Sequence, residues 1–219
     1  ACSGWIGSPD NCVFTAGHCL PNREVAQVNV PLSLPNGTLQ HPPIEDQFAV
    51  DDTTIVYEDD GPFVSGAGTD WGVFRIHPNN LGQSAAELHG WYEVGFFDPL
   101  PGEDIRVDGF GSDGGVNNHA HQTDVGPFAE ATPLALHYAV DTTGGSSGSV
   151  VVYEPTGEAI GIHTNGGCDE TSGANAGTSM TNPTLMAAAG AECQSNALAV
   201  PVANLLEDHI ECCERVSSN

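Results

Sequence analysis

The sequence contains no lysine and only four arginines, against 29 acidic residues, so its formal net charge is −25. Such a chain has too few cations to neutralise a phosphate backbone, which excludes nucleic acid as an expected partner. No apolar run is long enough for a membrane-spanning helix, and no signal peptide precedes Ala1. We therefore expect a mature, soluble protein with an acidic, solvated surface and no membrane partner.

The remaining composition is typical of an all-β protein. The 219 residues can bury a real hydrophobic core, and they include 27 glycines and 15 prolines spread along the chain. Short runs that contain Val, Ile and Phe alternate with these turn residues, which favours strands over a doubly wound α/β fold.

The strand-like runs fall into two stretches. Residues 1–80 and 103–200 are rich in such runs, and residues 81–102, interrupted by Gly-Gln-Ser, Asp-Pro and Pro-Gly, are predicted to link them. Within residues 201–219 the apolar periodicity becomes helical, which predicts a C-terminal helix packed on the body of the protein. The residues that carry this periodicity are Val202, Leu205, Leu206, His209, Ile210 and Cys213.

Seven cysteines occur without zinc-finger spacing. They predict disulfides and an oxidising compartment, so we expect a secreted, extracellular protein. Because the number is odd, at least one cysteine is left unpaired.

A histidine follows the first clear strand signal. In Cys12-Val-Phe-Thr-Ala-Gly-His18-Cys19, an apolar run leads into a turn of small residues that presents His18. An imidazole in such a place can act as a general base near neutral pH.

An aspartate begins a second apolar run, Asp70-Trp-Gly-Val-Phe-Arg-Ile76. A carboxylate that orients an imidazole needs apolar walls, which this run can supply. The rival carboxylates lie in acidic runs that indicate exposed turns; they are Asp51, Asp52, Asp59 and Asp60.

A serine lies in the glycine-rich segment Asp141-Thr-Thr-Gly-Gly-Ser-Ser147-Gly-Ser149. The glycines allow the backbone to turn so that the amides of Gly145 and Ser147 point together at a developing oxyanion. Hydroxyl, imidazole, carboxylate and oxyanion donors are the parts that a serine-dependent peptide hydrolysis needs. The alternative is a flexible Gly/Ser loop without chemistry.

Thr-Ala-Gly-His-Cys, the aspartate run and Gly-x-Ser-Gly, in this order, resemble the motifs of chymotrypsin-like serine peptidases over nearly the whole chain. The resemblance implies a serine endopeptidase with His18, Asp70 and Ser147 as its triad. It also implies two six-stranded antiparallel β-barrels with the active site between them and a C-terminal α-helix. We expect protein or peptide substrates, no cofactor or metal, and a monomer.

The pocket segments resemble those of bacterial glutamyl endopeptidases, in which residues at the places of His163 and Thr142 receive the substrate carboxylate. This implies cleavage after glutamate. Asp141 favours the opposite, because by register it falls where trypsins keep the aspartate that binds lysine or arginine. Cleavage after basic residues therefore stays open, as does a protease-like binding module without turnover.

Three further pocket residues follow from the resemblance. Thr164 lies where the family places a hydroxyl that bonds the triad aspartate, while Gly166 and Gly177 match small residues that keep the pocket walls open.

The resemblance also implies disulfides. Cys2 and Cys19 bracket the histidine loop, and Cys168 and Cys193 bracket the glycine-rich segment near the pocket. Cys12 is then expected to reach one of two cysteines near the end of the chain, Cys212 or Cys213.

The sequence also departs from the family. The sequence begins almost at Cys2, with too few residues before it for the usual first strand, so either that strand was removed or the first barrel closes differently. Ser146 replaces an aspartate that captures a new N-terminus in animal digestive members. His119-Ala-His121 is a possible fragment of a zinc site, although a polar loop is the simpler interpretation.

Overall fold

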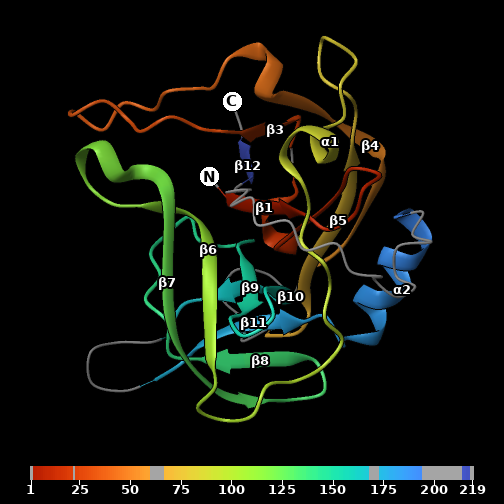
Figure 1. Ribbon diagram of the computed structural model, residues 1–219, viewed down its shortest axis with the longest axis vertical. Helices are drawn as coiled ribbons and strands as arrows, with labels where there is room; N and C mark the ends of the chain where they lie inside the picture. The colour runs from red at the N-terminus through yellow and green to blue at the C-terminus, as the bar shows by residue number, and fades with distance from the viewer. Residues whose placement is uncertain (1, 22, 60–66, 168–172, 194–213, 218–219) are drawn as a thin grey trace.

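The structure is a computed structural model in which two antiparallel β-barrels lie against each other (Figure 1). The predicted fold of two six-stranded barrels is confirmed. The structure describes residues 2–21, 23–59, 67–167, 173–193 and 214–217.

The first barrel is built around the histidine and aspartate segments. In hydrogen-bonded order its strands are β1 (Cys2–Ile6), β12 (Glu214–Ser217), β3 (Val25–Val28), β4 (Gln47–Asp59), β5 (Asp70–Ile76) and β2 (Cys12–Thr15). The core of this barrel includes Val13, Phe48 and Phe74, which lie on β2, β4 and β5 and are all fully buried.

The second barrel carries the serine segment between two of its strands. In the same order its strands are β10 (Glu158–Asn165), β11 (Asn175–Ser179), β8 (Ala135–Tyr138), β7 (Asn118–Ala131), β6 (Asp104–Ser112) and β9 (Val150–Tyr153). Its core includes Ile105, Leu136 and Ile160. A third cluster joins the barrels, because Trp5 and Phe14 of the first pack with Val150 and Ile162 of the second.

The first barrel closes through the end of the chain. β12 pairs with β1, where Val216 lies opposite Cys2, and with β3, where Ser217 lies opposite Val25. The barrel thus has β12 as its sixth strand, and this strand occupies part of the segment 201–219 that was expected to be helix and tail.

Helical segments are few. The linker carries α1 (Ala85–His89), and 3-10 turns lie at η1 (Gly17–Cys19), η2 (Ile44–Asp46) and η3 (Gly115–Asn117). Among the described residues, no helix is long and apolar enough to span a membrane.

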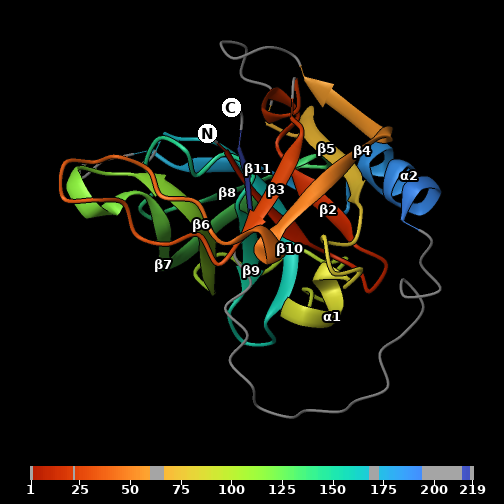
Figure 2. The same ribbon diagram turned by 90° about the horizontal axis from the view of Figure 1, so that it is seen from above.

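The longest helix is α2 (Pro183–Glu192), which follows the last strand of the second barrel and packs against β4 and β5 of the first (Figure 2). The Asn182 side chain caps it by accepting the amides of Thr184 and Leu185, and Pro183 suits its first turn. The apolar residues that predicted a later helix, 202 to 213, lie outside the described residues.

Two disulfides occur in the described part of the chain. One joins Cys2 to Cys19, as expected, with Cα atoms 5.9 Å apart. The other joins Cys12 to Cys193, with Cα atoms 5.5 Å apart. The predicted pair Cys168–Cys193 is therefore wrong, and so is the expectation that Cys12 pairs with Cys212 or Cys213. The physical reason is that α2 crosses to the first barrel and ends beside β2. Three cysteines lie outside the described residues: Cys168, Cys212 and Cys213.

Candidate active site

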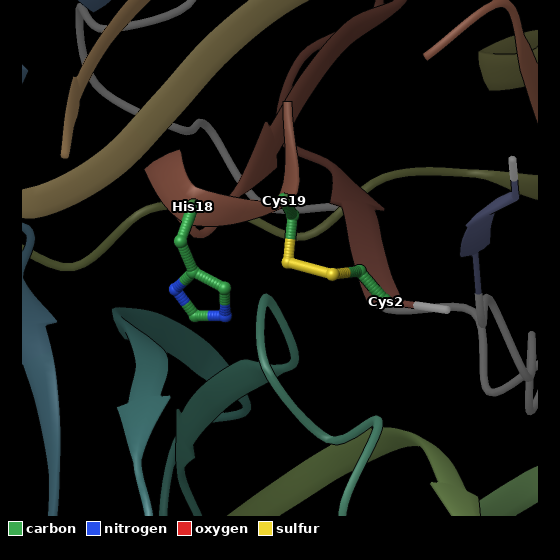
Figure 3. A group of neighbouring side chains, drawn as sticks. All are labelled: Cys2, His18 and Cys19. Carbon is green, nitrogen blue, oxygen red and sulfur yellow. A yellow bond between two sulfur atoms is a disulfide. The ribbon is translucent and has the colours of Figure 1, made fainter. Parts of the chain in front are cut away.

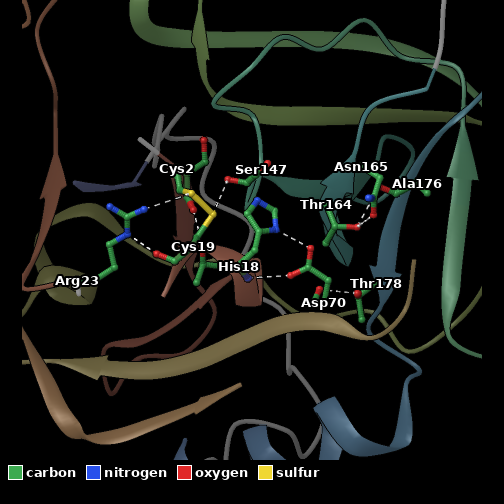
Figure 4. A network of polar contacts seen from close by, with 12 residues as sticks. Cys2, His18, Cys19, Arg23, Asp70, Ser147, Thr164, Asn165, Ala176 and Thr178 are labelled. Atoms are coloured by element: carbon green, nitrogen blue, oxygen red, sulfur yellow. Dashed lines mark hydrogen bonds and ion pairs between the residues drawn. A yellow bond between two sulfur atoms is a disulfide. The ribbon is translucent and has the colours of Figure 1, made fainter. Parts of the chain in front are cut away.

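His18 and Asp70 meet because β2 and β5 are neighbouring strands, with Thr15 opposite Gly72. The His18 Nδ1 atom lies 2.6 Å from Asp70 Oδ2, and the His18 backbone amide donates to Asp70 Oδ1 at 3.0 Å (Figure 4). Both oxygens of the Asp70 carboxylate therefore bind His18, one through its ring and one through its backbone amide. These contacts fix the imidazole with Nε2 directed away from Asp70.

The position before the histidine requires glycine for a steric reason. A Cβ on Gly17 would lie 1.9 Å from the carbonyl oxygen of Glu58 and 2.9 Å from that of Trp71. Only glycine lets η1 approach β4 and β5 this closely, so the Ala-Gly-His sequence places the imidazole beside Asp70.

The Asp70 carboxylate also sets the basicity of the imidazole. Its hydrogen bond and its charge raise the pKa of His18 above 6.5, although partial burial of the ring opposes this rise.

Ser147 lies on the loop between β8 and β9, on the opposite side of the ring from Asp70 in Figure 4. Its carbonyl oxygen accepts the Ser3 amide at 2.8 Å and lies 3.8 Å from Cys19 Sγ, which places the loop beside η1. In the described part of the chain, no hydrogen bond joins the Ser147 hydroxyl to the imidazole. Such contacts are often long without substrate and shorten when it binds.

The amides around Ser147 differ in their partners. The amides of Ser146, Gly148 and Ser149 donate to backbone carbonyls, whereas those of Gly145 and Ser147 donate to no acceptor among the described residues. Gly145 has a φ of +97°, a left-handed conformation that favours glycine. The sequence predicted the amides of Gly145 and Ser147 as oxyanion donors, and neither is engaged with another acceptor in the described part of the chain.

His163 lies on β10 directly beside this loop. Its amide donates to Ser149 O at 2.8 Å, and its carbonyl accepts the Gly148 amide at 2.7 Å. The His163 side chain is buried, and Nδ1 lies 2.7 Å from the hydroxyl of Tyr138.

Burial, and secondarily the nearby charge of His18, lowers the pKa of His163 to about 4, so the ring is neutral near pH 7. Burial also raises the pKa of Tyr138 well above 10, which keeps its hydroxyl protonated. Within the described residues, His163 Nδ1 is the hydrogen-bond partner of this hydroxyl, and we take the hydroxyl as the donor. We therefore assign the remaining ring proton to Nε2, which makes Nε2–H a donor.

Thr142 is held by Asn175, a residue that the sequence analysis missed. The Asn175 amide nitrogen donates to Thr142 Oγ1 at 2.9 Å and to Val140 O at 2.6 Å, while its Oδ1 accepts the Gly167 amide at 2.7 Å. Since the Thr142 oxygen accepts this bond, its own proton remains available for another acceptor.

Asp141 lines a cavity of about 190 Å³ on the β6–β7 side of the serine loop, together with Asp113 and Asp124. Its backbone amide donates to Asp124 Oδ2 at 2.8 Å. Thr142 lines the same cavity, whereas His163 does not.

The remaining pocket residues have mixed outcomes. The Thr164 hydroxyl donates to Asn165 Oδ1 at 2.8 Å and contacts Ala176 O at 3.4 Å, so the bond that was expected to Asp70 does not form. Thr178 instead donates to the backbone carbonyl of Asp70 at 2.7 Å.

The two positions where pocket glycines were expected differ in whether a side chain would fit. A Cβ on Gly177 would lie 2.4 Å from Ile162 O and 3.1 Å from the Tyr138 hydroxyl, so only glycine fits there. Gly166 has ordinary space around it, since its nearest neighbour would be 3.9 Å away.

Residues 2–162 match the family described as trypsin-like peptidase domain. The chain belongs to this family. A search of curated protein sequences found no match.

The fold of this trypsin-like peptidase is shared by solved protease structures. A Glu endopeptidase in complex with MPD is 17% identical, with a TM-score of 0.64 over 89% of this chain and 86% of that one. The thermostable serine protease AL20 from an extremophilic microorganism is 16% identical, with a TM-score of 0.61 over 89% and 91%. Protease Anisep from Arthrobacter nicotinovorans is 19% identical, with a TM-score of 0.61 over 89% of both chains.

Two groups in the trypsin-like peptidase have the residue types of a metal site. Cys2, His18 and Cys19 offer ligand atoms within 4.8 Å of one another, but the disulfide in Figure 3 leaves no thiolate to bind an ion. His119 contacts the Ser112 hydroxyl while His121 bonds Asp108, so the two imidazoles are directed to different partners.

Proposed function

We propose that this trypsin-like peptidase is a secreted serine endopeptidase that cleaves polypeptide chains after glutamate, with His18, Asp70 and Ser147 as its triad. The observation that carries the proposal is the convergence of an Asp70-bound imidazole and a serine loop in which the amides of Gly145 and Ser147 have no acceptor among the described residues.

The chemistry follows from these groups. His18 Nε2 takes the hydroxyl proton as Ser147 Oγ bonds to the carbonyl carbon of the substrate, and the oxyanion accepts the amides of Gly145 and Ser147. The carbon–nitrogen bond then breaks, and the proton passes from His18 to the departing amine. Water repeats the sequence on the acyl-enzyme and releases the acid.

Glutamate recognition rests on His163 and Thr142. Each has a proton free for an acceptor, Nε2–H on the neutral imidazole and the hydroxyl of Thr142, and both lie beside the serine loop. A carboxylate bound by neutral donors forms charge-assisted hydrogen bonds, whereas an apolar side chain would leave these donors unpaired.

Asp141 supports this choice over cleavage after basic residues. The aspartate lines a cavity shared with Asp113, Asp124 and Thr142, which His163 does not line. We infer that the glutamate side chain is bound mainly at His163, outside this acidic cavity.

Secretion is supported by the two disulfides, which persist in oxidising compartments and are rare in the cytosol.

A panel of matched peptides that differ only in Glu, Gln, Arg, Lys or Phe at the cleaved position tests the specificity. We expect Glu to be preferred over Gln by about 100-fold in kcat/KM. His163→Ala should remove most of this preference, while the matched control His137→Ala, on β8, should retain it. Faster cleavage after Arg or Lys at both low and high salt would reject glutamyl specificity and assign the preference to Asp141.

A fluorophosphonate probe tests the remaining alternative. We expect it to label Ser147 stoichiometrically in the folded protein. A folded protein that neither labels nor cleaves any peptide of the panel would be a binding module.

A further inference from the structure

Ser3 on β1 is completely buried, and its polar groups link the two barrels. The amide of Ser3 donates to Ser147 O in the second barrel at 2.8 Å, and its carbonyl accepts the Thr15 hydroxyl in the first barrel at 2.7 Å. Ser147 and its neighbours are drawn in Figure 4. Its hydroxyl oxygen accepts the backbone amide of Phe110 on β6 at 2.8 Å.

The proton of the Ser3 hydroxyl has two acceptors within reach. Gly145 O lies 3.1 Å from Oγ and Phe110 O lies 3.3 Å away, so the shorter contact leads to the serine loop. One hydroxyl thus accepts from β6 and donates to the residue whose amide is a proposed oxyanion donor.

These bonds restrain the segment that carries the free amides. The carbonyls of Gly145 and Ser147, both held by Ser3, flank the peptide unit whose N–H belongs to Ser147. The Gly145 N–H lies in an earlier peptide unit, whose carbonyl, on Gly144, accepts the Ser112 amide at 2.7 Å. Rotation of the Gly145 N–H would break this bond, and rotation of the Ser147 N–H would break the bond from the Ser149 amide to Ser146 O at 2.9 Å, while the Ser3 bonds fix the peptide units on either side of the Ser147 N–H.

The close approach of the barrels at this point requires glycines. A Cβ on Gly109 would lie 1.8 Å from Ser149 Oγ and 2.9 Å from Ser3 Oγ. A Cβ on Gly148 would lie 2.1 Å from the Ser3 carbonyl oxygen. The packing around Ser3 therefore leaves its side chain little freedom to move.

Ser3 also follows directly on Cys2, which is bonded to Cys19 beside His18 (Figure 3). Two consecutive residues of β1 thus connect the imidazole on one side and the serine loop on the other.

We infer that Ser3 is a positioning residue, whose hydroxyl fixes the Gly145–Ser147 segment so that both oxyanion donors face the substrate carbonyl beside His18. The inference deepens the proposed function and rests on it. Misplacement of oxyanion donors weakens transition-state stabilisation while leaving ground-state binding intact, so the loss should fall on kcat.

The test compares Ser3→Ala with Ser33→Ala. Ser33 is a matched control because it is also buried and its hydroxyl also crosses between barrels, to Asn118 O at 2.6 Å, without contact to the serine loop. Ser3→Ala should lower kcat by about 10- to 100-fold with little change in KM, and weaken a peptide aldehyde inhibitor by a similar factor. Ser33→Ala should change both by less than about twofold, and Ser3→Thr, which restores a hydroxyl, should recover part of kcat.

Amide hydrogen exchange at residues 144–147 supplies a readout that does not depend on turnover. Exchange should be faster in Ser3→Ala than in the wild-type protein and unchanged in Ser33→Ala. An inactive wild-type protein would reject the proposed function, whereas exchange would still decide whether Ser3 orders the loop. The inference is overturned if kcat and exchange in Ser3→Ala match the wild type, if both alanine variants lose activity equally, or if neither Ser3→Ala nor Ser3→Gly folds.

Discussion

Acid should destabilise the folded protein through His163. In the folded state burial holds the pKa of His163 at about 4, while the unfolded state has the ordinary value of 6.5. Between these two values the unfolded chain binds a proton that the folded chain does not. The free energy of unfolding must therefore fall as the pH decreases from about 6.5 to about 4.

The size of the effect follows from the difference of the two pKa values. Each pKa unit corresponds to about 1.4 kcal/mol, so His163 should cost about 3 kcal/mol of stability by pH 4. This is a large fraction of the roughly 5–15 kcal/mol that stabilises a typical domain. His18 acts in another window: its folded pKa is raised, so its stabilisation is fully present below pH 6.5 and is lost as the pH rises through the folded value.

Urea unfolding at a series of pH values between 4 and 7 measures this dependence. The many carboxylates also titrate there, so the informative quantity is the difference between the wild-type protein and His163→Gln, which cannot titrate and can still accept the Tyr138 hydroxyl. The wild type should lose about 3 kcal/mol more than the variant over this range. Equal losses, or an NMR titration of the folded His163 ring near pH 6.5, would refute the assignment of a buried neutral imidazole.

Three other predictions follow from the site and the disulfides. Ser147→Ala should lower kcat for peptide hydrolysis by about 100-fold or more while circular dichroism stays unchanged; near-normal turnover would show that another residue attacks. The kcat/KM for a neutral peptide should rise with one ionisation above pH 6.5, because the pKa of His18 is raised by Asp70; a flat profile from pH 5 to 9 would contradict this. The double variant of Cys12 and Cys193 to serine should lower Tm without lowering kcat, because the bond ties α2 to the first barrel; an unchanged Tm in differential scanning calorimetry would count against that role.

The sequence predicted the parts of the site that are encoded locally. Gly17 is required by the approach of η1 to β4 and β5, and Gly145 by its left-handed conformation. Constraints of this kind leave a recognisable pattern around His18 and Ser147. The alternation of apolar runs with turn residues predicted an all-β protein, whereas the two barrels were implied by the resemblance to chymotrypsin-like peptidases.

Contacts between distant segments could not be predicted. The disulfide between Cys12 and Cys193 spans 181 residues and depends on where α2 packs. The alanines of this helix give it little amphipathic contrast, so its sequence does not indicate which face packs against the first barrel. Asn175 and Tyr138 lie on strands whose sequences carry no motif, so their partners emerge only from the pairing of β11 with β8 and β10. Ser3 is one short polar residue in a strand, and only the meeting of the two barrels makes its hydroxyl informative.

The charge of the protein bears on how glutamate would be selected. A net charge of −25 repels an acidic substrate at long range, and a neutral His163 offers no opposing charge. Selectivity must then come from short-range hydrogen bonds, whose loss leaves buried donors unpaired when the wrong side chain enters. Because the screening length shrinks from about 10 Å at 0.1 M salt to about 3 Å at 1 M, salt reduces the repulsion far more than it reduces contacts inside the pocket. The acidic surface and the glutamyl pocket are therefore compatible, and the surface would govern how fast acidic substrates arrive while His163 governs which bond is cut.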